Sequence, residues 1–286
     1  MKMVASAKLR RLQERVLFGN NFLKSLHNIG CSLRQSQNDA ETINTWLTPD
    51  GKHDLIIIFG AENVLCGGFH GHQMRQINNV IDENPDAKLL VFGTKAVDAL
   101  KAHKNKILPM NLDLKHPKMQ NFFSIAKKLE LLKTKKEISR IQVIGSAFKN
   151  ILSQKPYCKI LCPFEFTDHS TRSPRPVGSR DNSPVESSSL RAPGERGNPY
   201  PADTSIFEPS IDVFLPYFFT QYLAVSLHQC WLETLAGEMA SRMTAMDNAT
   251  RNAKDMISDL SLVYNRTRQA KITTELTEII AGSQGA

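Results

Sequence analysis

Residues 211–280 are the feature that most restricts the fold of this chain, because they predict one uninterrupted helix. The stretch contains a single proline, Pro216, and a single glycine, Gly237. Apolar side chains recur along it at steps of three or four residues, the spacing of one helix face. About 60 helical residues extend ~90 Å, whereas a compact chain of 286 residues is only ~50 Å across. The helix is therefore expected to project from the rest of the molecule, and its apolar stripe predicts partners along it.

The N-terminal segment predicts a second helix, which is the natural first partner of the long one. Residues 1–45 contain no proline, and apolar side chains again recur at steps of three or four. Residues 1–34 carry seven Lys or Arg and one acidic residue, whereas residues 205–286 carry six basic and nine acidic residues. This asymmetry indicates either that the two helices face each other or that the basic half binds nucleic acid or another acidic partner.

Between the two helical segments, short apolar runs alternate with helical patterns. This order is typical of βαβ units and predicts an α/β domain with a mostly parallel sheet. The expected strands are 54–60, 88–93, 107–112, 140–148 and 158–164, and the expected helices are 73–82, 94–100 and 119–132.

Residues 167–205 differ in composition from the rest of the chain. Ser, Pro, Gly and Arg dominate the segment, and no apolar periodicity is present from which a core could form. The composition predicts a disordered loop, with a phosphorylation or binding segment as the alternative.

The glycine-rich stretch Gly60–Gly71 lies after an expected strand and before an expected helix, the place of a nucleotide-binding loop. It contains neither G-x-G-x-x-G nor a glycine followed by Lys-Ser or Lys-Thr, so we interpret it as a turn that uses the backbone freedom of glycine. Cys158 and Cys162 lack the tight spacing usual in a zinc site, and the eight histidines are scattered. We therefore expect no catalytic residue, no cofactor and no metal ion.

Apolar runs are too short to predict a membrane-spanning helix. The longest, Val213–Leu227, contains Pro216 and Gln221 and is shorter than the ~20 residues that a span needs. A basic stretch rather than an apolar one follows Met1, so no signal peptide is expected. Five cysteines, an odd number, suit a reducing compartment.

Several motifs together resemble one known family. The run RMTAMDNATRNAKDMISDLSLVYNRTRQAKITTELTEIIAG (Arg242–Gly282) closely resembles the C-terminal signature of the gamma subunit of F-type ATP synthases. Four further segments are similar to elements of the same family, in the same order: MKMVASAKLRR (Met1–Arg11), VLCGGFH (Val64–His70), FKNILSQKP (Phe148–Pro156) and FEPS (Phe207–Ser210).

The chain also departs from the family pattern at three places. The family has a longer N-terminal helix, so the resemblance implies a shortened N-terminus here. Gly60–Val64 replaces a Ser-Asp-Arg-Gly type of sequence, and the segment 167–205 is longer and richer in Pro and Ser than is usual.

The resemblance implies a fold and a division of the chain. The fold would be an α/β domain, Rossmann-like with a mostly parallel sheet, set on a long antiparallel coiled coil of the N- and C-terminal helices. The implied division is a shaft helix at 1–48, the α/β domain at 49–166, the disordered loop at 167–205 and the C-terminal shaft helix at 206–286.

The resemblance also implies a function without bond chemistry, that of a rotating central shaft. Such a shaft couples transmembrane proton flow to ATP synthesis or hydrolysis in a ring of catalytic and non-catalytic nucleotide-binding subunits. Its other partners would be a small epsilon-type subunit and a membrane ring of ion-carrying subunits, with no nucleic acid and no direct membrane insertion. Its place would be peripheral, on the cytoplasmic face of a bacterial inner membrane or the matrix side of a mitochondrial one.

By resemblance, six residues are expected to contact the catalytic ring. Arg268, Gln269, Thr273 and Glu275 would lie near the tip of the shaft, and Arg242 and Met1 would lie lower, facing an acidic segment of the catalytic subunits. For each residue the alternative is surface solvation or packing within the coiled coil.

Two other classes of protein remain as alternatives from the sequence. A nucleic-acid-binding coiled-coil protein with an α/β module would suit the net charge of +8 and the basic N-terminal helix, but the basic segments lack interleaved aromatic residues. An α/β enzyme with a helical oligomerisation arm is disfavoured by the missing phosphate loop.

Overall fold

A computed structural model describes residues 2–36, 46–108, 119–148, 150, 154–165 and 211–284. The segment 167–205, for which the sequence predicts a disordered loop, lies outside the described residues, as does Met1.

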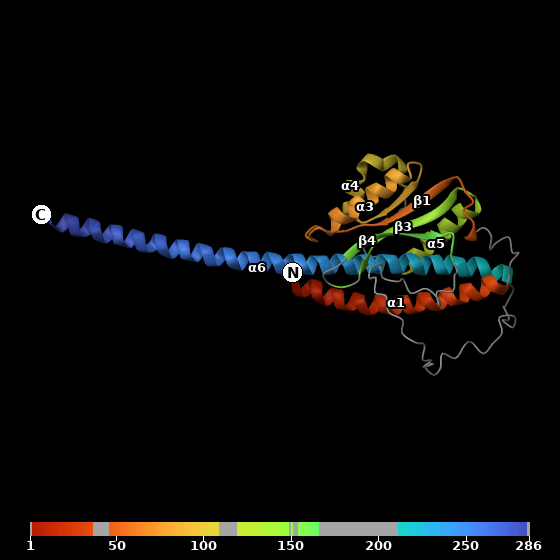
Figure 1. The fold of residues 1–286 in the computed structure, drawn as a ribbon, viewed down its shortest axis with the longest axis horizontal. Helices are drawn as coiled ribbons and strands as arrows, with labels where there is room; N and C mark the ends of the chain where they lie inside the picture. The colour runs from red at the N-terminus through yellow and green to blue at the C-terminus, as the bar shows by residue number, and fades with distance from the viewer. Residues whose placement is uncertain are drawn as a thin grey trace, which may run out of the picture.

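The C-terminal helix α6 spans Ile211–Gln284, a length of 74 residues or about 110 Å. In Figure 1 the other elements gather around its N-terminal half, and its C-terminal half extends beyond them. The predicted projecting helix is therefore confirmed.

Helix α1, Lys2–Ser36, packs antiparallel along the N-terminal half of α6. Leu9, Leu12 and Val16 are buried against α6, where small side chains such as Ala236 and Ala240 let the helices approach closely. The predicted pairing of the two terminal helices is confirmed over this length.

A polar contact fixes the register of these two helices. The side-chain amide of Gln229 in α6 donates to the carbonyl oxygen of Val16 at 3.0 Å and to Oδ1 of Asn20 at 2.9 Å. A Cβ atom on Gly19 would lie 2.1 Å from Oε1 of Gln229. A side chain at position 19 would therefore force the end of the Gln229 side chain to shift.

Four strands form one sheet in the order β2-β1-β3-β4. They are β1 (His53–Phe59), β2 (Lys88–Phe92), β3 (Ile138–Phe148) and β4 (Gln154–Cys162). Strand β1 pairs in parallel with both β2 and β3, and β4 runs antiparallel to β3. The sheet is therefore mostly parallel, as predicted.

Both faces of the sheet are covered, which explains the continuous apolar run in β1. Leu55, Ile57 and Phe59 pack in a cluster with α5 (Met119–Thr134) and α6, whereas Ile56 and Ile58 pack in another cluster with α3 (Phe69–Glu83) and α4 (Thr94–Ala99). Helix α6 thus serves both as the partner of α1 and as a cover for the sheet. The main-chain N–H of Ser146 in β3 also donates to Oγ1 of Thr234 in α6 at 3.1 Å.

One strand prediction lies mostly outside the described residues, and another needs correction. At the expected strand 107–112, the 3-10 helix η1 (Lys101–Lys106) is followed by a single parallel bridge between Leu89 and Ile107, and residues 109–112 lie outside the described part. The expected strand 158–164 begins earlier, at Gln154, and is antiparallel. The short connection from β3 permits only an antiparallel return, because a parallel strand needs a longer crossover.

Candidate functional site: the projecting helix and its anchoring loop

Every residue of α6 from Asn248 to Ser283 is exposed. This projecting half extends about 50 Å. Its large exposed apolar residues are Met256, Ile257, Leu260, Leu262, Val263, Tyr264, Ile272, Leu276, Ile279 and Ile280. Apolar surface on this scale marks a site of protein interaction. Among the described residues, none covers this surface.

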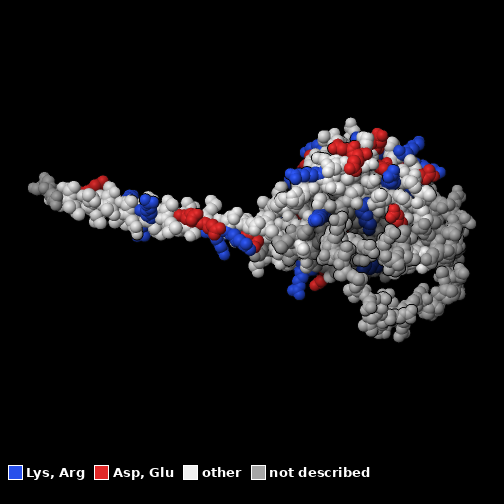
Figure 2. All heavy atoms as spheres, in the orientation of Figure 1, with Lys and Arg blue, Asp and Glu red and all other residues white. Residues whose placement is uncertain are grey.

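Charged residues of both signs lie along the side of the projecting half that Figure 2 shows. Near its base, Arg251 donates to Asp247 at 2.9 Å, one turn away along the helix. Exposed pairs of this kind contribute little to stability. The projecting half therefore exposes charged side chains of both signs as well as apolar ones.

The structure brings four of the six expected contact residues together. Arg268, Gln269, Thr273 and Glu275 all lie on the projecting half, within about two helical turns, and all are exposed. The Thr273 hydroxyl donates to the carbonyl oxygen of Gln269 at 2.9 Å. The exposed side chains of Arg268 and Glu275 can therefore reach a partner from one short segment of the helix.

Arg242 lies at the base of the projecting half, about 40 Å along the helix from Arg268. It forms an ion pair with Glu238, one turn earlier in α6, and its Nη1 donates to Sδ of Met239 at 3.2 Å. The side chain of Arg242 is 14% exposed and that of Glu238 only 3%. Arg242 is thus engaged inside the chain, with a small part of its side chain open to a partner.

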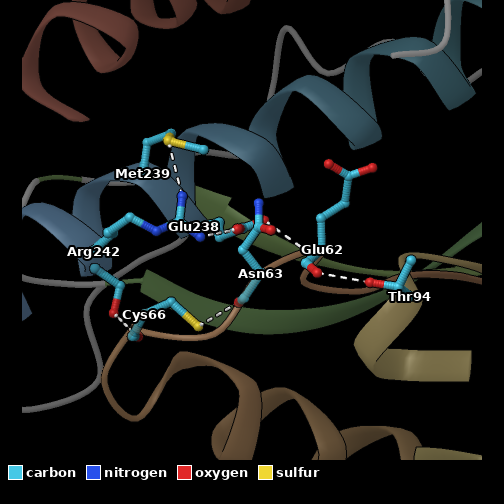
Figure 3. A network of polar contacts seen from close by, with 8 residues as sticks. Glu62, Asn63, Cys66, Thr94, Glu238, Met239 and Arg242 are labelled. Carbon is cyan, nitrogen blue, oxygen red and sulfur yellow. Dashed lines mark hydrogen bonds and ion pairs between the residues drawn. The ribbon is translucent and has the colours of Figure 1, made fainter. Parts of the chain in front are cut away.

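The Arg242–Glu238 pair belongs to a network that fastens the loop after β1 to α6 (Figure 3). Oε2 of Glu238 accepts the main-chain N–H of Glu62 at 3.4 Å, and the Thr94 hydroxyl donates to the carbonyl oxygen of Glu62 at 2.7 Å. The Ser241 hydroxyl donates to the carbonyl oxygen of Cys66 at 2.6 Å. We call residues 60–68 the anchoring loop.

The tip of the anchoring loop has a constrained backbone. Leu65 has φ of 71° and Gly67 has φ of 57°, both in the left-handed region, which a bulky side chain such as that of Leu65 rarely adopts. Cys66 between them is buried, and burial, with the Glu238 carboxylate nearby, raises the pKa of its thiol. The Cys66 thiol therefore packs inside the turn. Its neighbours Val64 and Leu65 are exposed.

The sequence contained a signal for only part of this network. Glu238 and Arg242 are four residues apart, a spacing that predicts an ion pair on a helix. Glu62 meets Glu238 of α6, and Thr94 meets Glu62, only through the tertiary fold, so no local pattern marks them.

Metal-binding clusters and membrane-spanning helices are both absent from the described residues. No group of three or more His, Cys, Asp or Glu among them is arranged to hold a metal ion. None of the described helices is long and apolar enough to cross a bilayer.

Comparison with known proteins defines the class. The model of a family described as ATP synthase matches residues 1–285. The chain is 32% identical to the ATP synthase gamma chain of Allorhizobium ampelinum, over 99% of this chain and 92% of that protein. It is 30% identical to the ATP synthase gamma chain of Heliobacterium modesticaldum, over 99% of this chain and 91% of that protein.

Solved structures agree at the level of the fold. A chain of the central stalk and c-ring of Tetrahymena thermophila mitochondrial ATP synthase matches with a TM-score of 0.55 at 20% identity, over 87% of this chain and 97% of that one. A chain of the Euglena gracilis mitochondrial ATP synthase matches with a TM-score of 0.54 at 18% identity, over 98% and 95%.

The family match and the relatives agree over nearly the whole length. This chain belongs to the ATP synthase gamma chain family. The resemblance found in the sequence is therefore confirmed, and no comparison supports the alternative of a nucleic-acid-binding protein.

Proposed function

We propose that this chain is the central shaft that couples ion flow through a membrane ring to ATP synthesis or hydrolysis in a ring of nucleotide-binding subunits. The observation that carries the proposal is the projecting half of α6, with its exposed apolar residues, anchored firmly at its base. A helix exposed on all faces for about 50 Å needs a surrounding partner, and a shaft enclosed by a ring has one.

The proposal divides the chain by role. Residues 1–48 and 206–286 would form the antiparallel coiled coil of the shaft, and 49–166 would form a Rossmann-like α/β domain at its base. The segment 167–205, for which the sequence predicts a disordered loop, lies outside the described residues. The packing of α1 on α6 and the parallel order β2-β1-β3 support the first two assignments.

Contacts with the nucleotide-binding ring are proposed at two heights. Arg268, Gln269, Thr273 and Glu275 contact it near the tip, which their common exposure on the projecting half supports. Arg242 and Met1 contact an acidic segment of the catalytic subunits lower down. For Arg242, whose side chain is 14% exposed, an acidic partner would meet that exposed part.

The shaft acts by differential contact rather than by bond chemistry. As an asymmetric helix turns, each catalytic site in the ring meets a different face of it, and the contacts of each face shift the nucleotide affinity of that site. The α/β domain, together with a small epsilon-type subunit, would join the shaft to the membrane ring. The chain would thus be peripheral, on the cytoplasmic face of a bacterial inner membrane or the matrix face of a mitochondrial one.

Co-expression with the two nucleotide-binding subunits of the same organism tests this proposal. We expect a complex that contains this chain and hydrolyses ATP, whereas the chain alone does neither. A variant with Leu260→Asp and Ile272→Asp should fold normally, because both side chains are exposed, yet assemble poorly. The matched control is Asp255→Asn on the same half. Normal assembly of the double variant would contradict a shaft held through its apolar stripe.

A further inference from the structure

A groove of about 630 Å³ lies between α1, α6 and the start of α5. Its apolar lining consists of Phe18 and Phe22 from α1, Val225 and Leu232 from α6, and Met119, the first residue of α5. Phe18 is 77% exposed and Phe22 43%, and the two lie one turn apart on the same helix face. Exposed aromatic side chains beside an apolar groove indicate a binding surface.

Three side chains that can donate hydrogen bonds line the same groove. They are Arg11 and Arg15, one turn apart on α1, and His228 of α6. Of the described residues, none forms an ion pair with either arginine and none forms a hydrogen bond with the His228 ring. Burial and the nearby charge of Arg15 lower the pKa of His228, so its neutral ring carries one N–H that can be donated.

The charges along the groove favour an anion. Arg11 and Arg15 each contribute a full positive charge, and among the described residues that line the groove Glu14 alone is acidic. The lining therefore has a net positive charge next to an apolar surface. This combination suits a ligand that has an apolar body and one anionic group.

The size of the groove favours a small molecule over a protein segment. Sites for small molecules occupy ~300–1,000 Å³, and this groove of about 630 Å³ lies within that range. A helix ~10 Å in diameter would fill the same volume in ~8 Å, or about one and a half turns. The anchors of a helix that docks in a groove extend over about two turns, so a helix would be held by only part of them.

We propose that this groove binds an amphipathic anion, a small molecule with an aromatic or aliphatic body and one carboxylate or sulfonate group. The apolar body lies against Phe18 and Phe22. The anionic group meets Arg11, Arg15 and the N–H of His228. A bound ligand would touch α1, α5 and α6 together and would stabilise their packing. This inference rests on the groove and not on the shaft function, so it is tested on the isolated chain.

Fluorescence titration of the purified full-length chain with anilinonaphthalene sulfonate tests the groove, because this dye has an aromatic body and one sulfonate group. Phenylnaphthylamine, which has the same aromatic body without the sulfonate, is the comparison. We expect saturable binding of the sulfonate dye and binding of the neutral dye weaker by about tenfold, since charged hydrogen bonds are lost. Absence of sulfonate binding, or equal affinity for the two dyes, would overturn the assignment.

Two pairs of substitutions on α1 locate the binding. Arg15→Gln should weaken binding of the sulfonate dye by about fivefold, whereas Arg10→Gln, at an exposed position outside the groove, should leave it unchanged. Phe18→Ser should weaken both dyes by about fivefold or more, whereas Leu17→Ser, 66% exposed and outside the groove, should weaken neither. All four side chains are exposed, so each variant should unfold at the temperature of the parent. If the two variants of either pair bind the sulfonate dye equally, the dye lies elsewhere and the proposal is wrong.

Competition with the bound sulfonate dye identifies the class of ligand. We expect dodecanoate to displace the dye, and dodecyltrimethylammonium, which has the same chain and the opposite charge, to leave it bound. An acidic amphipathic peptide is the third competitor. Failure of dodecanoate to displace the dye, or equal displacement by the two chain compounds, would overturn the proposal. Displacement by the peptide and not by dodecanoate would mean that the groove takes a partner helix instead.

Discussion

The ion pair between Arg242 and Glu238 shows how much of the anchor depends on single side chains. Glu238 is almost fully buried, so its charge is tolerated only because Arg242 and the main chain of Glu62 compensate it. The family resemblance implies that Arg242 contacts the catalytic ring, and the structure shows it in an internal ion pair. The two are compatible, because the ion pair orients the guanidinium at the base of the projecting half.

Arg242→Ala should lower the free energy of unfolding by about 3 kcal/mol, because it leaves the buried carboxylate of Glu238 unpaired. Arg251→Ala is the matched control, since Arg251 is paired with Asp247 but is 73% exposed, and it should cost less than about 1 kcal/mol. Urea unfolding followed by circular dichroism measures both. Equal costs for the two variants would mean that the pair at the base does not anchor the loop.

Glu233 provides a prediction on pH. Burial raises the pKa of its carboxyl group, so the folded state binds its proton more tightly than the unfolded state does. The resulting stabilisation is complete below the unfolded pKa of ~4 and is lost as the pH rises through the higher folded value. Glu233→Gln keeps the hydrogen-bonding shape but removes the charge. We expect equal melting temperatures for the variant and the parent in acid, and a higher one for the variant at neutral pH.

Melting curves across that pH range, by differential scanning calorimetry, make the comparison. A variant that is less stable than the parent at neutral pH would show that the charge of Glu233 is favourable. In that case the hydrogen bond from the Tyr157 hydroxyl, at 3.5 Å, and the charge of Lys159 outweigh its burial.

At the scale of elements, α1 and α6 lie close together at Gly19. Helix propensity alone therefore predicts the wrong sign for the effect of Gly19→Ala on stability. Gly19→Ala should favour the helix by about 1 kcal/mol from propensity. The new Cβ atom would, however, lie 2.1 Å from Oε1 of Gln229 and force that side chain from its bonds to Val16 and Asn20. We expect a net destabilisation of about 1–2 kcal/mol, from lost hydrogen bonds and steric strain.

Gly71→Ala is the control for this prediction. Gly71 also lies inside a helix, but no atom lies within 4 Å of an added Cβ, so the variant should gain up to about 1 kcal/mol. Both variants are compared by urea unfolding. A stabilised Gly19→Ala variant would show that the helices do not require the close approach.

The elements also show how far sequence reasoning reaches. The long helix, β1 and β2 were predictable because a periodic or continuous apolar pattern identifies each of them locally. The direction of β4 was not, because it depends on the short connection that precedes it. Of the expected strand 107–112, the described part shows the bridge between Leu89 and Ile107, and residues 109–112 lie outside it.

In the candidate site, too, local sequence patterns predict some features, and others depend on the tertiary fold. Exposure of Arg268 and Glu275 could be anticipated from a helix too long for the globule. The contacts of the anchoring loop could not, because only the tertiary fold brings Glu62 to Glu238 and Cys66 to Ser241.

At the scale of the whole molecule, the arrangement is a base and a projecting shaft on one continuous helix. Helix α6 is buried among α1, α5 and the sheet over its N-terminal half and exposed over its C-terminal half. A torque applied to the base is thus carried to the tip through a single element, with no hinge in the described chain between them.

Rotation against the nucleotide-binding ring is the central claim, and observing single complexes tests it most directly. Cys158 is exposed on the sheet, whereas Cys66, Cys162 and Cys230 are buried, so a probe can be attached at Cys158 after Cys31→Ser removes the half-buried thiol. With the ring fixed to a surface and Mg-ATP supplied, the account predicts that the probe turns continuously in one direction and stops when ATP is removed. A probe that stays fixed relative to the ring while the same complexes hydrolyse ATP would contradict it.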